Sequence, residues 1–230
     1  MDPDAYLTHT RQDLDAFAAC LAADLSTPIE HCGDWTLYDL ADHHGRGSIW
    51  TVAAITERRG DHQPPAAPRD PAALRAWFDA ATDQLIRALS VDPATEAWTI
   101  HPPPTVGFWR RRRCLEALIH RWDVEHALAI DTPIDSELAD DGVAEVVDTL
   151  APRQIRLGRA AEPRHAVRFA ATDTGGSWIL GPGAPVATAS GAAADLLLML
   201  WRRLAQQSAG ISWEGDVESA QRVLSEPLVP

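Results

Sequence analysis

The sequence predicts an α+β protein in which an N-terminal four-helix bundle is followed by a small α+β domain. The first half contains four segments whose apolar residues recur at helical spacing, and loops separate them. The second half contains short strand-like runs, a glycine-containing turn and two further helical patterns. A chain of 230 residues is long enough to form both units. We expect the bundle to span residues 1–154 and the second domain residues 155–230.

The first two helices are predicted from apolar spacing and from a capping sequence. Residues 4–25 carry leucine and phenylalanine side chains close to a helical period. Thr36 is a good N-cap for the next helix, and Asp39 three residues later is its acidic partner in the first turn. This second helix should run to about residue 59 and end at Gly60.

Prolines mark the connections around the next two helices. Pro71 suits the first position of a helix, which should continue through residue 89. Residues 93–107 include three consecutive prolines and are expected to form an irregular connection. A fourth helix should then run from residue 108 to about residue 130. Because each helix has one apolar side, the four are expected to pack as a bundle.

The second half begins with a further helix, expected over residues 136–153, and then changes character. Strands are predicted at residues 166–172, 177–180, 185–190 and 211–214. An apolar helix is expected over residues 192–204, and Asp216 can cap a last helix that ends near residue 224.

Composition and charge exclude several classes of function. The net charge is −13, which argues against nonspecific binding to nucleic acid or to anionic lipid, although residues 110–113 form a local run of arginines. All 20 basic residues are arginine, so a phosphate-loop lysine and lysine Schiff-base chemistry are ruled out. No apolar window is long enough to cross a membrane, and the acidic N-terminus does not look like a signal peptide. We therefore expect a cytoplasmic protein without a membrane or nucleic-acid partner.

The three cysteines do not suggest a site. Cys20, Cys32 and Cys114 are widely spaced, odd in number and form no CxxC pair. Neither a disulfide framework nor a thiolate zinc site is therefore expected, and buried apolar positions are the simplest interpretation.

The chemistry-bearing pattern lies on the fourth predicted helix. Glu116 and His120 are four residues apart and share one face, about one turn from each other. Arg113 and Asp123 extend the same stripe. A carboxylate and an imidazole directed into a helical bundle are a recurring way to present a metal ion, and a third ligand from another helix would leave one position open. A solvated face or an internal salt bridge would have the same spacing.

The third ligand is ambiguous from periodicity alone. His43 and His44 are adjacent on the second predicted helix. His44 lies nearer the centre of the face that carries Leu37, Leu40 and Gly47, and Asp39 precedes His43 by four residues. Helical spacing does not choose between the two histidines.

Two segments resemble a known family. Residues 32–43, CGDWTLYDLADH, are similar to the CPGWTVxDLxxH segment of the mycothiol-dependent maleylpyruvate isomerase family, a branch of the DinB-like superfamily. Residues 108–123, FWRRRRCLEALIHRWD, resemble that family's FWxRRxxExxxHRxD segment. Residues 172–178, 194–203 and 215–216 are similar to its small sterol-carrier-protein-like domain. Asp34 departs from the family pattern, and we expect only a loop difference there.

The resemblance implies that His43, Glu116 and His120 bind zinc and that the metal activates the thiol of mycothiol. Addition of the thiolate to an activated double bond would allow either cis–trans isomerisation of a maleylpyruvate-type substrate or S-transfer. Asp123 is expected to orient the His120 ring.

An anionic substrate or intermediate requires a cation, and arginine is suited to carboxylates. Arg113 is the first candidate, with a salt bridge to Glu116 or Asp123 as the alternative. Arg203, with its neighbour Arg202, is a weaker candidate.

The expected partners are therefore mycothiol and a small electrophile, bound by a monomer or homodimer. The competing hypothesis is a non-catalytic DinB-like protein that binds a metal or a small molecule. The presence of all three ligand residues favours the enzyme.

Overall fold

A computed structural model describes residues 2–230, except for the side chain of Pro3. The chain divides into two compact units, of which the first ends at Pro133 and the second spans Ile134–Pro230. No helix in the described part of the chain is long and apolar enough to cross a bilayer.

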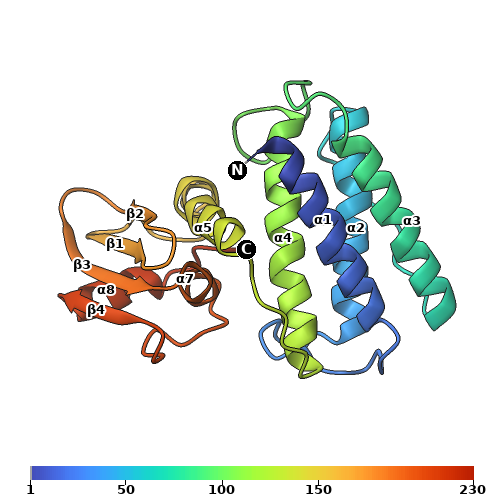
Figure 1. Cartoon of the computed structure of the whole chain (residues 1–230). Coiled ribbons are helices and arrows are strands. Elements are labelled where there is room, and N and C mark those ends of the chain that lie inside the picture. The colour runs from blue at the N-terminus through green and yellow to red at the C-terminus, as the bar shows by residue number, and fades with distance from the viewer. Residues whose placement is uncertain (1) are drawn as a thin grey trace. The chain divides into compact units, whose positions relative to one another are not determined.

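The first unit contains the four predicted helices, which run side by side (Figure 1). They are α1 (Pro3–Cys20), α2 (Leu37–Thr56), α3 (Pro71–Leu89) and α4 (Val106–Ala127). The bounds of α3 agree with the prediction at both ends. Helix α1 ends earlier than expected, because the backbone turns after Cys20 and Asp24 stabilises the next turn by accepting hydrogen bonds from Ser26.

Side chains that accept hydrogen bonds from the first turn define where the four helices begin. The N-caps are Asp2, Thr36, Asp70 and Thr105. At Thr36 the predicted pairing with Asp39 is a full capping box. The Thr36 hydroxyl accepts from the Asp39 amide at 3.3 Å, while Asp39 Oδ2 accepts from the Thr36 amide at 2.9 Å.

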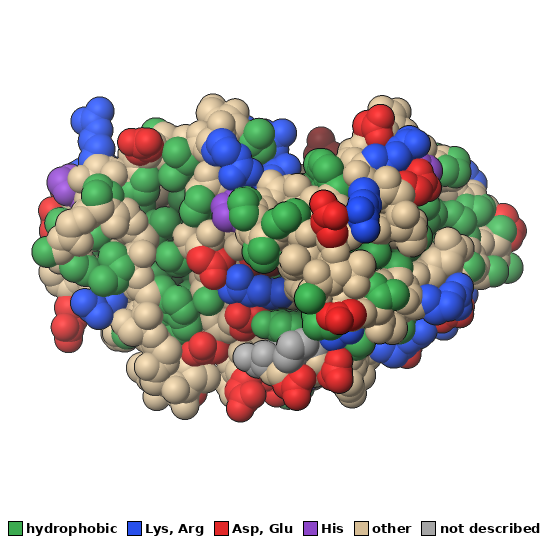
Figure 2. All heavy atoms as spheres, turned by 90° about the horizontal axis from the view of Figure 1, so that it is seen from above, with side chains coloured by type: hydrophobic (Ala, Val, Ile, Leu, Met, Phe, Trp, Pro, Cys, Tyr) green, Lys and Arg blue, Asp and Glu red, His purple; other side chains and the backbone are tan. Residues whose placement is uncertain are grey.

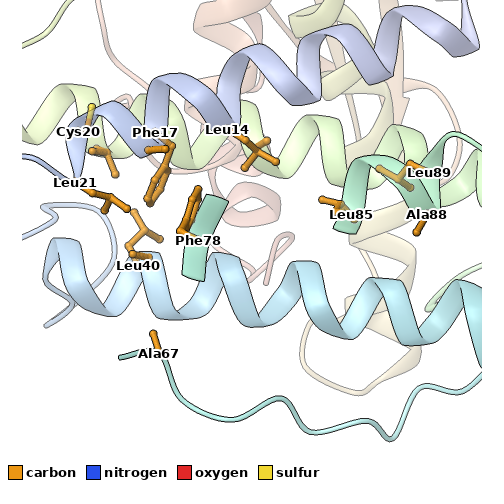
Figure 3. Close-up of a cluster of buried hydrophobic side chains, with 14 of the residues drawn as sticks. Leu14, Phe17, Cys20, Leu21, Leu40, Ala67, Phe78, Leu85, Ala88 and Leu89 are labelled. Atoms are coloured by element: carbon orange, nitrogen blue, oxygen red, sulfur yellow. The ribbon is translucent and has the colours of Figure 1, made fainter. Parts of the chain in front are cut away.

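Apolar side chains from α1, α2 and α3 fill the centre of the bundle (Figure 3). The rings of Phe17 and Phe78 stack with their centroids 5.0 Å apart, and Leu40 of α2 lies beside them. Leu14 and Leu85 continue this core and are almost completely buried. The apolar stripes seen in the sequence therefore meet in one continuous core.

A tryptophan cluster also stabilises the bundle. The ring of Trp50 lies edge-on to those of Trp98 and Trp109, with centroid distances of 5.3 Å to each. Trp109 donates its indole N–H to the Trp98 carbonyl at 2.6 Å, and Trp50 donates to the Gly60 carbonyl at 2.9 Å. Trp50 lies on α2 and Trp109 on α4, so these bonds attach the connections that contain Gly60 and Trp98 to the two helices.

The second unit combines helices with a four-stranded sheet. Its helical elements are α5 (Ser136–Glu145), η1 (Val146–Leu150), α6 (Ala151–Arg156), α7 (Ala193–Leu200) and α8 (Val217–Leu224). Its strands are β1 (Ala166–Ala171), β2 (Ser177–Leu180), β3 (Pro185–Gly191) and β4 (Ser212–Gly215), in the order β2-β1-β3-β4. The central pair β1 and β3 is parallel, and both outer pairs are antiparallel. The predicted α+β class is confirmed.

The expected boundary between residues 154 and 155 lies inside this second unit. Helix α5 packs against α7, and a Cβ atom at Gly142 would come within 2.9 Å of the Leu197 side chain. The helix predicted over residues 136–153 is therefore part of the C-terminal core. The apolar pattern of this helix predicts that one of its faces is buried, but it does not predict which unit that face packs against.

Charged side chains of both signs are interspersed on the face drawn in Figure 2. Because the chain contains no lysine, the basic groups there are arginines.

Replacing Thr36 by alanine should lower the free energy of unfolding by about 1 kcal/mol, because the capping box at the start of α2 loses its hydroxyl. Urea denaturation of the metal-free protein measures the effect. Thr36→Ser retains the hydroxyl and should stay near wild type, so equal loss in both variants would show that the cap is not the cause.

Candidate metal centre

Helices α2 and α4 bring three possible metal ligands together. His43 comes from α2, whereas Glu116 and His120 come from successive turns of α4. One ligand atom from each of the three residues lies within 4.8 Å of the other two. His43 Nε2 is 3.6 Å from Glu116 Oε1, and the rings of His43 and His120 are nearly perpendicular, with their centroids 5.4 Å apart. We call this group the inner cluster.

The inner cluster is open to solvent on one side. The side chain of His43 is 43% exposed, whereas those of Glu116 and His120 are 18% and 9% exposed. Trp35 packs on the His43 ring with a centroid distance of 4.9 Å. The two ligands from α4 are therefore more buried than the ligand from α2.

Two arginines hold Glu116. Arg113 Nη1 donates to Glu116 Oε2 at 2.8 Å, and Arg112 Nε lies 3.7 Å from the same oxygen. Burial by itself would raise the pKa of Glu116, but Arg113, the adjacent His43 and Arg112 together hold that pKa well below its usual value. Glu116 is therefore an anion whose Oε1 faces His43.

Arg113 is buried behind this carboxylate. Its Nη2 donates to the His44 carbonyl at 3.3 Å and to the Ser48 hydroxyl at 3.2 Å. Gly47 makes room for the guanidinium, because a Cβ atom there would lie 2.9 Å from Arg113 Nη1. With a side chain only 2% exposed, Arg113 forms the salt bridge that the sequence left as the alternative to a substrate contact.

Asp123 contacts His120 as predicted. Its Oδ2 lies 3.1 Å from His120 Nδ1, and the carboxylate is fully buried. Burial lowers the pKa of His120 more than the contact with Asp123 raises it, which favours a neutral ring. With Nδ1 paired, Nε2 is the nitrogen left for a ligand.

Cys32 extends this contact in a way that the sequence does not predict. Its thiol donates to Asp123 Oδ2 at 3.6 Å, so Cys32, Asp123 and His120 form a second possible ligand group that shares His120 with the inner cluster.

The structure separates the adjacent histidines of α2. His44 is completely buried, and its ring centroid lies 5.7 Å from that of Phe17 and 6.1 Å from that of Phe78. Burial, together with the nearby Arg113, lowers the pKa of His44 well below its usual value. His43, not His44, therefore belongs to the inner cluster. The central position of His44 on the apolar face was the sequence signal for its place in the core.

The remaining candidate arginines belong to the second unit. Arg203 donates to the Trp201 carbonyl at 2.8 Å, and its guanidinium lies 5.5 Å from the centre of the Trp201 ring. Arg202 donates to the carbonyls of Ser225 and Glu226 at 2.7 Å each.

The inner cluster has the donor set and the spacing of a zinc site. Imidazole nitrogen and carboxylate oxygen bind zinc at about 2.0–2.2 Å, so two ligands of a tetrahedral ion lie roughly 3.4 Å apart. The separation of 3.6 Å between His43 Nε2 and Glu116 Oε1 is close to this value. The donor types and this separation therefore suit a zinc ion, and the ligand atoms of all three residues lie within 4.8 Å of one another.

A third possible ligand group in the described part of the chain consists of Glu30, His31 and His126. The sequence does not predict this group, because its residues come from a loop and from the far end of α4. No spacing along the chain relates them.

Comparison with known proteins decides the family. A model described as the mycothiol maleylpyruvate isomerase N-terminal domain matches residues 7–125, and a model of the MDMPI C-terminal domain matches residues 137–222. The chain belongs to the mycothiol-dependent maleylpyruvate isomerase family. The resemblance carried by residues 32–43 and 108–123 is confirmed, and both segments lie in the N-terminal match.

Solved structures of the family enzyme share the fold. The crystal structure of the mycothiol-dependent maleylpyruvate isomerase aligns with a TM-score of 0.67 at 18% identity and covers 93% of both chains. A histidine-to-alanine mutant of that isomerase gives the same TM-score and coverage at 16% identity. Uncharacterised proteins from two strains of Mycobacterium tuberculosis are each 29% identical over 160 residues, which cover 66% of this chain and 82% of the relative.

Replacing Arg113 by alanine should destabilise the metal-free protein by about 3–5 kcal/mol, because Glu116 would be left as a buried charge without its main partner. Urea denaturation in the presence of a chelator measures the loss. The double variant Arg113→Ala/Glu116→Gln removes the unpaired charge and should recover part of the stability. If the double variant loses as much as the two single changes combined, the ion pair is not the source of the effect.

Proposed function

We propose that this chain is a zinc- and mycothiol-dependent enzyme that activates a low-molecular-weight thiol for addition to an electrophilic substrate. The reaction would be either a maleylpyruvate-type cis–trans isomerisation or an S-transfer. The observation that carries the proposal is the cluster of His43, Glu116 and His120 in a member of the mycothiol-dependent maleylpyruvate isomerase family.

The donor set supports a catalytic zinc site. Two imidazoles and one carboxylate are three protein ligands, and a tetrahedral ion bound by three ligands keeps one position for a small molecule. The exposed side of His43 gives that position access to solvent. When zinc is bound, it lowers the pKa of a ligating thiol, so that the thiol is held as the nucleophilic thiolate.

The surrounding residues keep the ligands in the required ionisation state and orientation. Arg113 and Arg112 keep Glu116 anionic and leave Oε1 toward His43. Asp123 pairs with His120 Nδ1, as carboxylates beside metal-binding histidines commonly do. Asp123 and Arg113 therefore act as positioning residues for the ligands.

The arrangement favours a thiol over water as the activated molecule. A zinc hydrolase needs a nearby carboxylate base that is not a ligand. On α4 the candidate is Asp123, which is fully buried and engaged by both His120 and Cys32. A thiolate needs no such base. Arg203 of the second unit stays the weaker candidate for binding an anionic group. The cytoplasm is the proposed location.

Replacing Glu116 or His120 by alanine should remove the tightly bound zinc, because each variant loses one of three protein ligands. Elemental analysis after desalting measures the metal content, with about one zinc per wild-type chain expected. His62→Ala changes a histidine that belongs to none of the three described ligand groups and should retain the wild-type content. If Glu116→Ala and His62→Ala retain equal amounts, the inner cluster is not the site.

Asp123→Asn should lower zinc affinity about 10–100-fold, because the amide replaces the charged partner of His120 Nδ1. Competition with a chromophoric chelator gives the affinity. Cys32→Ser, which alters the other contact of Asp123, should have a smaller effect. A larger effect of the cysteine change would indicate that the thiol itself binds the metal.

The mechanism is tested by replacing zinc with cobalt and titrating the protein with mycothiol. A sulfur-to-cobalt charge-transfer band should appear as the thiol binds, and mycothiol-dependent conversion of maleylpyruvate or another electrophilic alkene should follow in the zinc protein. No band at millimolar thiol, alongside ester or amide hydrolysis, would overturn the proposal in favour of a hydrolase. Metal binding without reaction with any thiol would favour the non-catalytic DinB-like alternative.

A further inference from the structure

We propose that the bundle carries a second, solvent-exposed site for a divalent transition-metal ion, formed by Glu30, His31 and His126. We call this group the outer site. It shares no ligand with the inner cluster, and it is independent of the function proposed above.

The spacing of the donor atoms supports the outer site. One ligand atom from each of the three residues lies within 4.8 Å of the other two. His126 Nε2 is 3.3 Å from Glu30 Oε2, close to the roughly 3.4 Å expected between two ligands of tetrahedral zinc. Two imidazoles and one carboxylate suit zinc, nickel or copper better than magnesium or calcium.

The loop that carries Glu30 and His31 is held in place by its own hydrogen bonds. The Ile29 amide donates to the Trp35 carbonyl at 2.9 Å, and the Cys32 amide donates to the Ile29 carbonyl at 3.0 Å. The Ile29 side chain is only 1% exposed and anchors the loop in the bundle core. The contact between Cys32 and Asp123 attaches the same loop to α4. The two loop ligands are therefore presented by an ordered backbone.

Aromatic stacking orients the imidazole on α4. The rings of His126 and Trp122 are nearly parallel, with their centroids 4.6 Å apart. His31 lies against the same pair, at 5.7 Å from Trp122 and 5.6 Å from His126. These contacts restrict both rings before any ion binds, which lowers the entropic cost of assembling the site.

The local charge favours a cation. His126 lies in the last turn of α4, where the helix dipole presents its negative end. Beside His126 is a hollow whose lining also includes Trp122, Asp131 and Thr132, which gives this side of the imidazole access to water. Because the side chains of Glu30 and His126 are 71% and 46% exposed, we expect weaker binding than at the inner cluster.

The position of the outer site links it to the loop that contacts the inner cluster. His126 follows His120 by six residues, which is about 9 Å along the helix axis. An ion held by the loop and α4 would cross-link them, and the same loop carries Trp35 against His43. Occupancy of the outer site should therefore raise the melting temperature, since a ligand that binds only the folded state stabilises it.

The test is calorimetric titration of the metal-free, full-length protein with Zn²⁺, comparing wild type with His126→Ala, His31→Ala and the control His62→Ala. Wild type and His62→Ala should show two classes of site with one ion each. His126→Ala and His31→Ala should retain the tight class and weaken the second by roughly tenfold or more. Glu116→Gln should lose the tight class and keep the second, together with its zinc-dependent rise in melting temperature.

The proposal would be overturned if the weaker class of Zn²⁺ binding had the same affinity in His126→Ala, His31→Ala and His62→Ala. The weakly bound ions would then be adventitious counterions on an acidic surface. A single class of site in the wild-type protein that Glu116→Gln abolishes would also overturn it. A single class that His126→Ala abolishes and Glu116→Gln leaves intact would instead support the outer site and refute the inner one. The proposals for the inner cluster and for the outer site can therefore be refuted independently of each other.

Discussion

The buried ion pair between Arg113 and Glu116 connects the candidate metal centre to the bundle. Arg113 is held by the His44 carbonyl, the Ser48 hydroxyl and Glu116, so each partner that compensates for its burial lies on α2 or on its own helix. The glycine at position 47 leaves the space that the guanidinium occupies. The pair determines both the ionisation of Glu116 and the direction of its free oxygen, and so it determines where a metal could be held.

One stretch of α4 supplies two candidate ligands and the side chains that pair with them. Arg113, Glu116, His120 and Asp123 follow one another at intervals of three or four residues, so a single helical stripe contains two ligands and a partner for each. Helix α2 contributes the third candidate ligand, His43, which is adjacent to the core residue His44. Its adjacent histidines point in different directions, one into the core against Phe17 and Phe78 and the other toward α4. A change in the packing of that core would therefore move the third ligand.

The loop between α1 and α2 connects the two ligand groups of the bundle. It carries Trp35 against His43, Cys32 against Asp123, and the two residues that face His126. The Thr36 cap ends the loop and begins α2, so the capping box also sets the relation of the loop to His43. The loop therefore contacts the candidate ligands of both groups.

Local patterns in the sequence determined the helices, the strands and the stripe on α4. Pro71 and Thr36 predicted where α3 and α2 begin, because proline and hydroxyl caps act within one turn of the backbone. Helical periodicity left His43 and His44 open, the family resemblance favoured His43, and the tertiary structure placed His43 beside Glu116 and His44 in the core. Only the tertiary structure paired Arg113 with Glu116, joined the helix after residue 135 to the second unit, and gathered Glu30, His31 and His126. Periodicity identifies which face of a helix is buried, whereas the identity of the facing groups depends on how separate elements pack.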